Sequence, residues 1–202
     1  LDSIQERHSE IVRALVCDGQ KSIEYNRHSM ITGPEMAVQM SQEQPITFVW
    51  GPPGTGKTQT LAKIALAHIA QGKRVLMVSY SNVSVDGAIM RVHEQSPHKE
   101  PGTLVRYGYA RRKDLLEHEY LTSYNLVIRN HPELLKERRD LIAERKKLSK
   151  NSPRYLEIGR RLSQIKNTLQ QEEKEAVRAA KFVATTVSKA IIDSTVRDTR
   201  FD

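Results

Sequence analysis

The strongest chemical signal in the sequence is the segment Gly51–Thr58, which reads Gly-Pro-Pro-Gly-Thr-Gly-Lys-Thr. It follows the pattern G-x-x-x-x-G-K-[ST] and lies between a run that predicts a strand and a run that predicts a helix. Glycines allow backbone angles and close approaches that a Cβ atom would block, so consecutive N–H groups can point inward. With the N-terminus of the helix, these groups would form a cradle for phosphates.

Two side chains of this segment would complete the chemistry. Lys57 would place a cation between the terminal phosphates of a nucleoside triphosphate, and the Thr58 hydroxyl would ligate Mg²⁺. We therefore predict Lys57 and Thr58 as catalytic residues and Thr58 as the metal ligand. The predicted nucleotide-binding residues are Gly51, Pro52, Pro53, Gly54, Thr55, Gly56, Lys57, Thr58 and Gln59. The alternative is a Gly/Pro-rich turn that holds no ligand.

The elements around this loop predict the fold class. Four short apolar runs predict strands, at 46–50, 74–79, 103–107 and 182–185, and the first of them is typical of a fully buried strand. Helices are predicted at 35–42, from the loop to Gly72, and at 83–94. Strands that alternate with helices indicate an α/β fold with a parallel sheet covered on both faces. An amphipathic helix is also predicted within residues 1–29.

Residues 131–181 differ in composition from the rest of the chain. They hold 14 Lys and Arg against 8 Asp and Glu, so +6 of the total net charge of +8 lies in a quarter of the 202 residues. Leucines and isoleucines repeat at heptad spacing before Pro153 and at three-four spacing after it, which predicts two antiparallel helices joined by a turn. The basic face of this hairpin either follows nucleic-acid phosphates or is simply solvated, and both interpretations stay open.

Composition excludes several classes of protein. No run approaches the roughly 20 apolar residues of a membrane span, and the N-terminus lacks a signal-peptide pattern, so we expect an intracellular protein, in the cytoplasm or the nucleus, with no membrane partner. A single cysteine, Cys17, excludes an internal disulfide framework, and the seven histidines show no metal-ligand spacing. Because the chain begins at Leu1 and stops at Asp202 without a terminal signal, we expect a fragment of a longer protein.

Further motifs resemble those of one helicase family. The loop form is shared by AAA+ proteins and superfamily 1 helicases, but Val75–Asp86 resembles motif Ia of the up-frameshift-type branch of superfamily 1, usually written A-P-S-N-x-A-V-D. Val105–Gly108 is similar to the R-x-G motif of that branch, and Phe182–Thr186 to its motif Ic. The branch also carries a charged helical insertion between those two motifs. The resemblance covers residues 31–202, the first RecA-like domain of such a helicase.

The resemblance implies a function for named residues. ATP phosphates would lie on Gly54, Gly56, Lys57 and Thr58, whereas Ser81, Asn82, Thr185 and Thr186 would contact one strand of DNA or RNA. Ser81 and Asn82 follow a predicted strand and open a predicted helix, a position that suits a backbone phosphate. Ordinary helix capping is the alternative for these two residues.

The resemblance also predicts the domain organisation. It implies a P-loop NTPase with a RecA-like sheet: a helical segment at 1–30, the first part of RecA-like domain 1A at 31–130, the inserted basic hairpin at 131–181, and the return to domain 1A at 182–202. A second RecA-like domain would be the partner within the same protein. The whole would be an ATP-dependent helicase that moves 5′-to-3′ on single-stranded nucleic acid.

The sequence departs from the family pattern at three places. Pro34 stands where the family has a glutamine that selects adenine. Tyr80 stands where the family usually has proline, and it either offers an aromatic face for a base or packs beside the end of the strand. The Asp-Glu pair that activates water is expected after Asp202, with Phe201 and Asp202 at the start of its strand. We therefore expect this chain alone to bind nucleotide weakly and not to hydrolyse it. An AAA+ ATPase and a non-catalytic nucleotide- or nucleic-acid-binding module remain the alternatives.

Overall fold

The computed structural model describes residues 33–202, which fall into two compact units divided between Ala67 and His68. The predicted helix within residues 1–29 and Cys17 lie outside the described residues. No helix in the described part is long and apolar enough to cross a membrane. Because the two units are separate bodies, each is considered by itself.

The first unit contains helix α2 (Gly33–Glu43), the glycine-rich loop and most of helix α3 (Lys57–Ala70). Both helices were predicted, and a Lys63–Glu35 ion pair of 3.3 Å joins them. The predicted strand at 46–50 is wrong. These residues form no strand, and the side chains of Phe48 and Trp50 are 82% and 89% exposed. A strand needs a hydrogen-bonded neighbour, and no strand of the described residues pairs with this segment.

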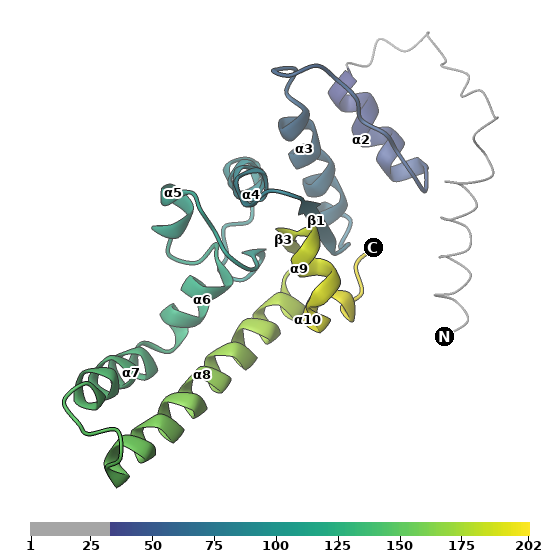
Figure 1. The fold of residues 1–202 in the computed structure, drawn as a ribbon. Helices are drawn as coiled ribbons and strands as arrows, with labels where there is room; N and C mark the ends of the chain where they lie inside the picture. Colours follow the sequence, from purple (N-terminus) through teal and green to yellow (C-terminus); the bar gives the residue numbers. More distant parts are fainter. Residues whose placement is uncertain (1–32) are drawn as a thin grey trace. The chain divides into compact units, whose positions relative to one another are not determined.

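The second unit is built on a three-stranded parallel sheet (Figure 1). Its strands are β1 (Val75–Ser79), β2 (Leu104–Arg106) and β3 (Phe182–Thr186), in the order β1-β3-β2. Phe182 is in register with Val75 on one side and with Leu104 on the other. All three strands were predicted within two residues of their ends, and the α/β fold class with a parallel sheet and an inserted helical hairpin is confirmed.

The core of this unit forms around β3, whose first four residues are fully buried. Helix α4 (Asn82–Gln95) packs on the sheet through the apolar face that carries Val85, Ile89 and Val92. On the other side, Val105 and Val183 form a cluster with Leu126, Val177, Ala180 and Val196. Val177 and Ala180 lie at the end of the hairpin helix that closes on the sheet, so the hairpin base is part of the same core.

The hairpin consists of α7 (Pro132–Arg145) and α8 (Pro153–Ala179), which lie side by side in Figure 1. Arg161 pairs with Glu137 at 2.6 Å and Arg154 with Glu144 at 2.7 Å. A later residue on α8 thus meets an earlier one on α7, so the helices are antiparallel, as predicted. Ser152 caps α8 by accepting a hydrogen bond from the Tyr155 N–H. The finer domain boundaries stay a prediction.

Four short helices complete the second unit: α5 (Lys113–Leu116), α6 (Ser123–Asn130), α9 (Val187–Ile192) and α10 (Ser194–Arg197). Arg74, just before β1, links the C-terminal end of α8 to the sheet by hydrogen bonds. Its guanidinium donates to the carbonyl oxygens of Val177 and Arg178 in the last turn of α8 and of Ala180, the C-cap residue just after it. A cation at a helix C-terminus satisfies carbonyls that have no partner within the helix.

Candidate functional site

The loop at Gly51–Thr58 has the backbone that phosphate binding requires. Gly54 and Gly56 adopt φ angles of 83° and 81°, a region that side chains with a Cβ atom rarely enter. At Gly51 the constraint is steric, because a Cβ atom there would lie only 2.6 Å from Thr55 Oγ1. The Thr55 hydroxyl donates to the Pro52 carbonyl oxygen at 2.8 Å and closes the turn. Each of the three glycines therefore has a physical reason to be glycine.

Lys57 closes over the loop that precedes it. Its Nζ donates to the carbonyl oxygens of Gly51 at 2.5 Å and Pro52 at 2.7 Å. The ammonium group is thus held at the loop, where phosphate oxygens could replace the two carbonyls as acceptors. The next residue, Thr58, is exposed in the first turn of α3.

The residues present fit a nucleotide phosphate with Mg²⁺. The loop offers N–H donors and a cation, and Gly51 leaves room that a Cβ would fill. No group of three or more His, Cys, Asp and Glu that could hold a metal occurs in the part of the chain that the structure describes. Mg²⁺ commonly takes one or two protein ligands, with phosphates and water supplying the rest. The Thr58 hydroxyl would be one such ligand.

Ser81 and Asn82 lie where β1 turns into α4, and both side chains have structural partners. Ser81 is the N-cap of α4, with its Oγ accepting from the Ser84 N–H at 3.0 Å. Asn82 Oδ1 accepts from Arg106 Nη2 at 2.8 Å. Capping, the alternative reading of Ser81, is thus present, and it leaves the first backbone N–H groups of α4 for a phosphate.

A fully buried ion pair holds this helix start to the next strand. Arg106, at the end of β2, donates from Nε to Asp86 Oδ1 at 2.7 Å, and both side chains are 0% exposed. Its other nitrogens donate to Asn82 Oδ1 and to the carbonyl oxygens of Tyr107 and Tyr109. The second carboxylate oxygen of Asp86 accepts the N–H groups of Arg111 and Arg112.

No role was predicted for Asp86 or Arg106, although both belong to motifs of the resemblance. The signal in the sequence is an aspartate on the apolar face of a predicted helix and an arginine inside an apolar strand. Charged residues at such positions are almost never buried without a partner. The pairing itself could not be predicted because 20 residues separate the two.

Thr185 and Thr186 end β3 in different environments. Thr185 is fully buried, and its hydroxyl donates to the Tyr107 carbonyl oxygen at 2.9 Å. In this position Thr185 supports the loop after β2, and its side chain has no exposed surface that a nucleic-acid strand could contact. Thr186 is partly exposed and caps α9 by accepting from the Lys189 N–H. Thr186, rather than Thr185, is therefore available to a ligand.

Two tyrosines are exposed just after the carboxyl ends of β1 and β2. Tyr80 is 91% and Tyr109 is 70% exposed, and the Arg111 guanidinium lies 5.4 Å from the ring centre of Tyr109. Ligands of open α/β sheets usually bind beyond the carboxyl ends of the strands. The aromatic face predicted at Tyr80 is exposed, and Tyr109, for which the sequence predicted no role, adds a second one.

Tyr107, just after β2, forms a cluster of polar contacts with Asp193 and Lys189. The Tyr107 hydroxyl donates to Asp193 Oδ2 at 2.9 Å, and Lys189 Nζ lies 2.6 Å from the same oxygen. Burial raises the pKa of Tyr107, and the bond to Asp193 raises it further. Burial also acts to raise the pKa of Asp193, but hydrogen bonds from Lys189 and Thr195 outweigh it and hold that pKa well below its usual range. These groups keep fixed charges near neutral pH and act as structural links.

The comparison with protein families decides the relationship. Residues 29–202, most of the chain, match the AAA domain family AAA_11. The chain belongs to this AAA domain family. The phosphate loop and the parallel sheet described above lie within the matched residues of the AAA domain, and so does the hairpin.

Curated relatives of this AAA domain are helicases and a DNA-binding protein. It is 31% identical over 117 residues to the uncharacterized ATP-dependent helicase MJ0104 of Methanocaldococcus jannaschii. The aligned residues make up 54% of this chain and 17% of that protein. It is 28% identical over 160 residues to DNA polymerase alpha-associated DNA helicase A of Saccharomyces cerevisiae, 75% of this chain and 22% of that protein. Over 50 residues it is 40% identical to DNA-binding protein SMUBP-2 of Rattus norvegicus, 25% of this chain and 5% of that protein.

The chain thus spans less than a quarter of the length of these relatives. The matches confirm the resemblance to the first RecA-like domain of a superfamily 1 helicase. Two of these three relatives are named as helicases, and each is matched over only part of its length.

Proposed function

We propose that this AAA domain binds ATP with Mg²⁺ and serves as one half of a motor that moves along single-stranded nucleic acid. The observation that carries the proposal is the loop at Gly51–Thr58, in which Gly54 and Gly56 adopt positive φ angles and the Lys57 ammonium group is held against the loop carbonyls. Gly54, Gly56, Lys57 and Thr58 would hold the phosphates, with Thr58 on Mg²⁺. A second RecA-like domain of the same protein would complete the motor, which would move 5′-to-3′.

The carboxyl ends of the strands support a nucleic-acid strand as the second ligand. Ser81, Asn82 and Thr186 stand at helix starts that offer backbone N–H groups to phosphates. Tyr80 and Tyr109 offer exposed rings on which bases stack. Because phosphate contacts and stacking do not read the sugar 2′-hydroxyl, these residues suit DNA and RNA equally.

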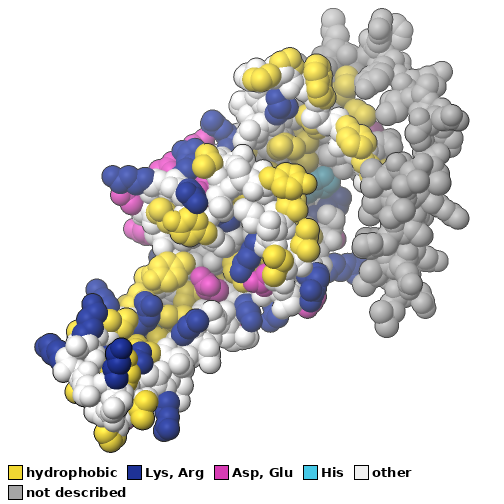
Figure 2. Space-filling model, in the orientation of Figure 1, with side chains coloured by type: hydrophobic (Ala, Val, Ile, Leu, Met, Phe, Trp, Pro, Cys, Tyr) yellow, Lys and Arg dark blue, Asp and Glu magenta, His cyan; other side chains and the backbone are white. Residues whose placement is uncertain are grey.

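The tip of the hairpin is a further candidate contact. Four cations at or near the tip form no ion pair with another residue in the range 33–202: Lys146, Lys147, Lys150 and Arg160. Arg145 also lies there, but its guanidinium is 4.2 Å from the ring centre of Tyr155. The acidic residues near the tip, Glu144 and Glu157, both pair with Arg154. Figure 2 shows Lys and Arg side chains around this end of the hairpin. Unpaired cations gain most when phosphates replace their counterions.

Nucleotide binding is tested by titrating a fluorescent ATP analogue into the chain with and without Mg²⁺. Lys57→Ala should weaken binding at least about tenfold, since a charge-assisted contact contributes about 1.5–3 kcal/mol. Thr58→Ala should remove most of the Mg²⁺ dependence. Lys63→Ala, on the same helix but paired with Glu35, is the matched control and should leave affinity unchanged. Equal effects of Lys57→Ala and Lys63→Ala would refute the proposed site.

Strand binding is tested by fluorescence anisotropy with a labelled oligo(dT) and a labelled oligo(rU) over a range of salt concentrations. A plot of log affinity against log salt concentration has a negative slope. Reversing the charge at Lys146 and Lys147 should reduce the magnitude of that slope by about 1.4, or about 0.7 for each lost phosphate contact on a single strand. Reversing Lys136 and Arg139 changes the net charge equally, farther from the tip. Identical slopes for the two double variants would show that only net charge matters.

A further inference from the structure

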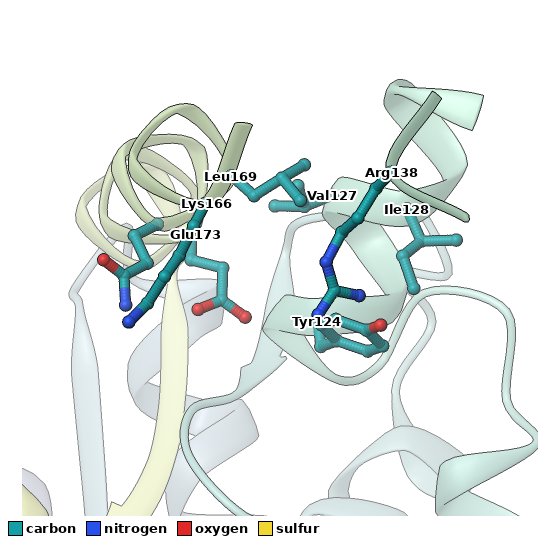
Figure 3. Close-up of a pocket in the computed structure, with 8 residues that line it drawn as sticks. Tyr124, Val127, Ile128, Arg138, Lys166, Leu169 and Glu173 are labelled. Carbon is teal, nitrogen blue, oxygen red and sulfur yellow. The ribbon is translucent and has the colours of Figure 1, made fainter. Parts of the chain in front are cut away.

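A cavity of about 190 Å³ opens at the base of the hairpin, between α6, α7 and α8. In Figure 3, Tyr124 and Arg138 stand on one side of it, and Leu169 and Glu173 stand on the other. Val127 and Ile128 of α6 add apolar wall. Figure 2 shows hydrophobic side chains gathered on the surface where the hairpin meets the rest of this unit. Neither the nucleotide loop nor the strand ends contribute a residue to this cavity.

The size of the cavity limits what it can hold. Sites for cofactors and drug-sized ligands usually enclose about 300–1,000 Å³, so this cavity is too small for such a molecule. It is large enough for one bulky apolar side chain. Aliphatic walls from Val127, Ile128 and Leu169 suit such a side chain, because burial of an apolar group there removes it from water. A single anchor in a small apolar pocket is typical of protein–protein recognition.

The charged side chains at the rim of the cavity determine which residues could stand beside the buried apolar side chain of a ligand. Arg138 and Lys166 are both exposed, and neither forms an ion pair with any residue of the described segment 33–202. Glu173 is half-buried and accepts a hydrogen bond from the Ser123 hydroxyl at 3.3 Å. Burial raises the pKa of Glu173. It is the one carboxyl group among the residues that line the cavity, where it stands against two cations. The rim is therefore cationic.

We propose that this cavity docks an acidic segment of a partner protein. One leucine, phenylalanine or tryptophan side chain of that segment would fill the cavity, and Asp or Glu beside it would face Arg138 and Lys166. A nucleic-acid base fits the walls less well, because its polar edges would lie against Val127 and Leu169 without hydrogen-bond partners. Tyr124 is also the one aromatic residue that lines the cavity. The proposal goes beyond the motor function and does not depend on it.

The test uses the 202-residue chain and a short labelled peptide in which one central tryptophan is flanked by Asp and Glu. Methyl NMR signals of Val127, Ile128 and Leu169 should shift as the peptide is added, and anisotropy should report binding. Reversing the charge at Arg138 and Lys166 should weaken binding at least about tenfold. Replacing the peptide tryptophan by alanine should weaken it by a similar factor.

A matched control separates this site from general attraction between opposite charges. Lys136→Glu with Arg139→Glu changes the net charge by the same amount on exposed α7 residues that do not line the cavity. This variant should stay within about twofold of the native affinity. Leu169→Gln tests the apolar wall without changing charge, and circular dichroism verifies that each variant is folded.

Three results would overturn the proposal. The first is a peptide that leaves the three sets of methyl signals unchanged. The second is an equal loss of affinity in the cavity variant and in the control variant. The third is displacement of the peptide by oligo(dT) or oligo(rU) with the same methyl shifts, which would make the cavity a nucleic-acid site. None of these results bears on nucleotide binding at Gly51–Thr58, so the two proposals fail separately.

Discussion

Replacing Arg106 by methionine should cost the second unit a large part of its stability. Arg106 and Asp86 are both fully buried, and the variant leaves the Asp86 carboxylate with two backbone N–H donors but without its cation. It also removes the donors to Asn82 and to the carbonyl oxygens of Tyr107 and Tyr109. Breaking one partner of a buried ion pair typically costs about 3–5 kcal/mol. A domain has only about 5–15 kcal/mol in total.

The assay is urea unfolding at neutral pH, followed by circular dichroism, with the free energy of unfolding obtained by linear extrapolation. Arg91→Met is the matched control, because Arg91 lies on α4 itself and forms an ion pair with Glu94 at 2.8 Å, but its side chain is half-exposed. An exposed pair contributes about 0–1 kcal/mol. A loss for Arg106→Met no larger than that for Arg91→Met would refute the reasoning.

The double variant Arg106→Met with Asp86→Leu makes the prediction sharper. Replacing a whole buried ion pair by apolar groups is often neutral or stabilising, since no charge is left without a partner. The double variant should therefore be more stable than the single Arg106→Met variant. Additive losses would mean that the two side chains act independently, contrary to the 2.7 Å contact between them.

Three further predictions concern other parts of the chain. Burial lowers the pKa of both His93 and His118 below 6.5, so the unfolded state binds more protons and stability should fall as the pH drops below 6.5 through the folded-state values. Urea unfolding at pH 8 and pH 5.5 should show this fall, and a His93→Gln, His118→Gln variant should flatten it; an unchanged pH dependence in that variant would contradict the assignment. Gly51→Ala should weaken ATP-analogue binding at least about tenfold with little change in melting temperature, because the added Cβ falls 2.6 Å from a threonine oxygen inside the loop; unchanged affinity would contradict the geometry. Arg74→Met should lower the free energy of unfolding by about 2–3 kcal/mol, since three carbonyls at the end of α8 lose their charged donor; a loss under about 0.5 kcal/mol would show that water replaces it.

Local sequence pattern was sufficient for most elements of the second unit. The runs at 75–79 and 182–186 combine β-branched residues with at least partial burial of every residue except Val78, so propensity and hydrophobicity agree. The heptad spacing of the hairpin likewise follows from the contact of two helices. The run at 46–50 has the same apolar character but forms no strand, because hydrogen bonding to a neighbour is a non-local property that the run itself does not contain.

The candidate site was predictable to different depths. The residues of Gly51–Thr58 are adjacent in the chain, so one pattern contains the whole loop. At the strand ends, the contribution of each residue depends on which neighbour it meets. Thr185 and Thr186 are consecutive and chemically identical, yet one is buried against Tyr107 and the other remains partly exposed. The cavity between α6, α7 and α8 depends on three helices and has no local signature.

The strand ends therefore contain two kinds of residue that the sequence motifs do not separate. The first kind is buried: Arg106, Asp86 and Thr185. Arg106 bonds to Asp86, and Thr185 bonds to the carbonyl oxygen of Tyr107, so together they fix the start of α4 and the loop after β2. The second kind, Tyr80, Tyr109 and Thr186, is exposed to a ligand. Substitution of the buried residues should lower both stability and strand affinity, whereas substitution of the exposed ones should lower affinity alone. A ligand surface on loops keeps its shape only if buried polar groups hold those loops, and the Arg106–Asp86 pair supplies that support here.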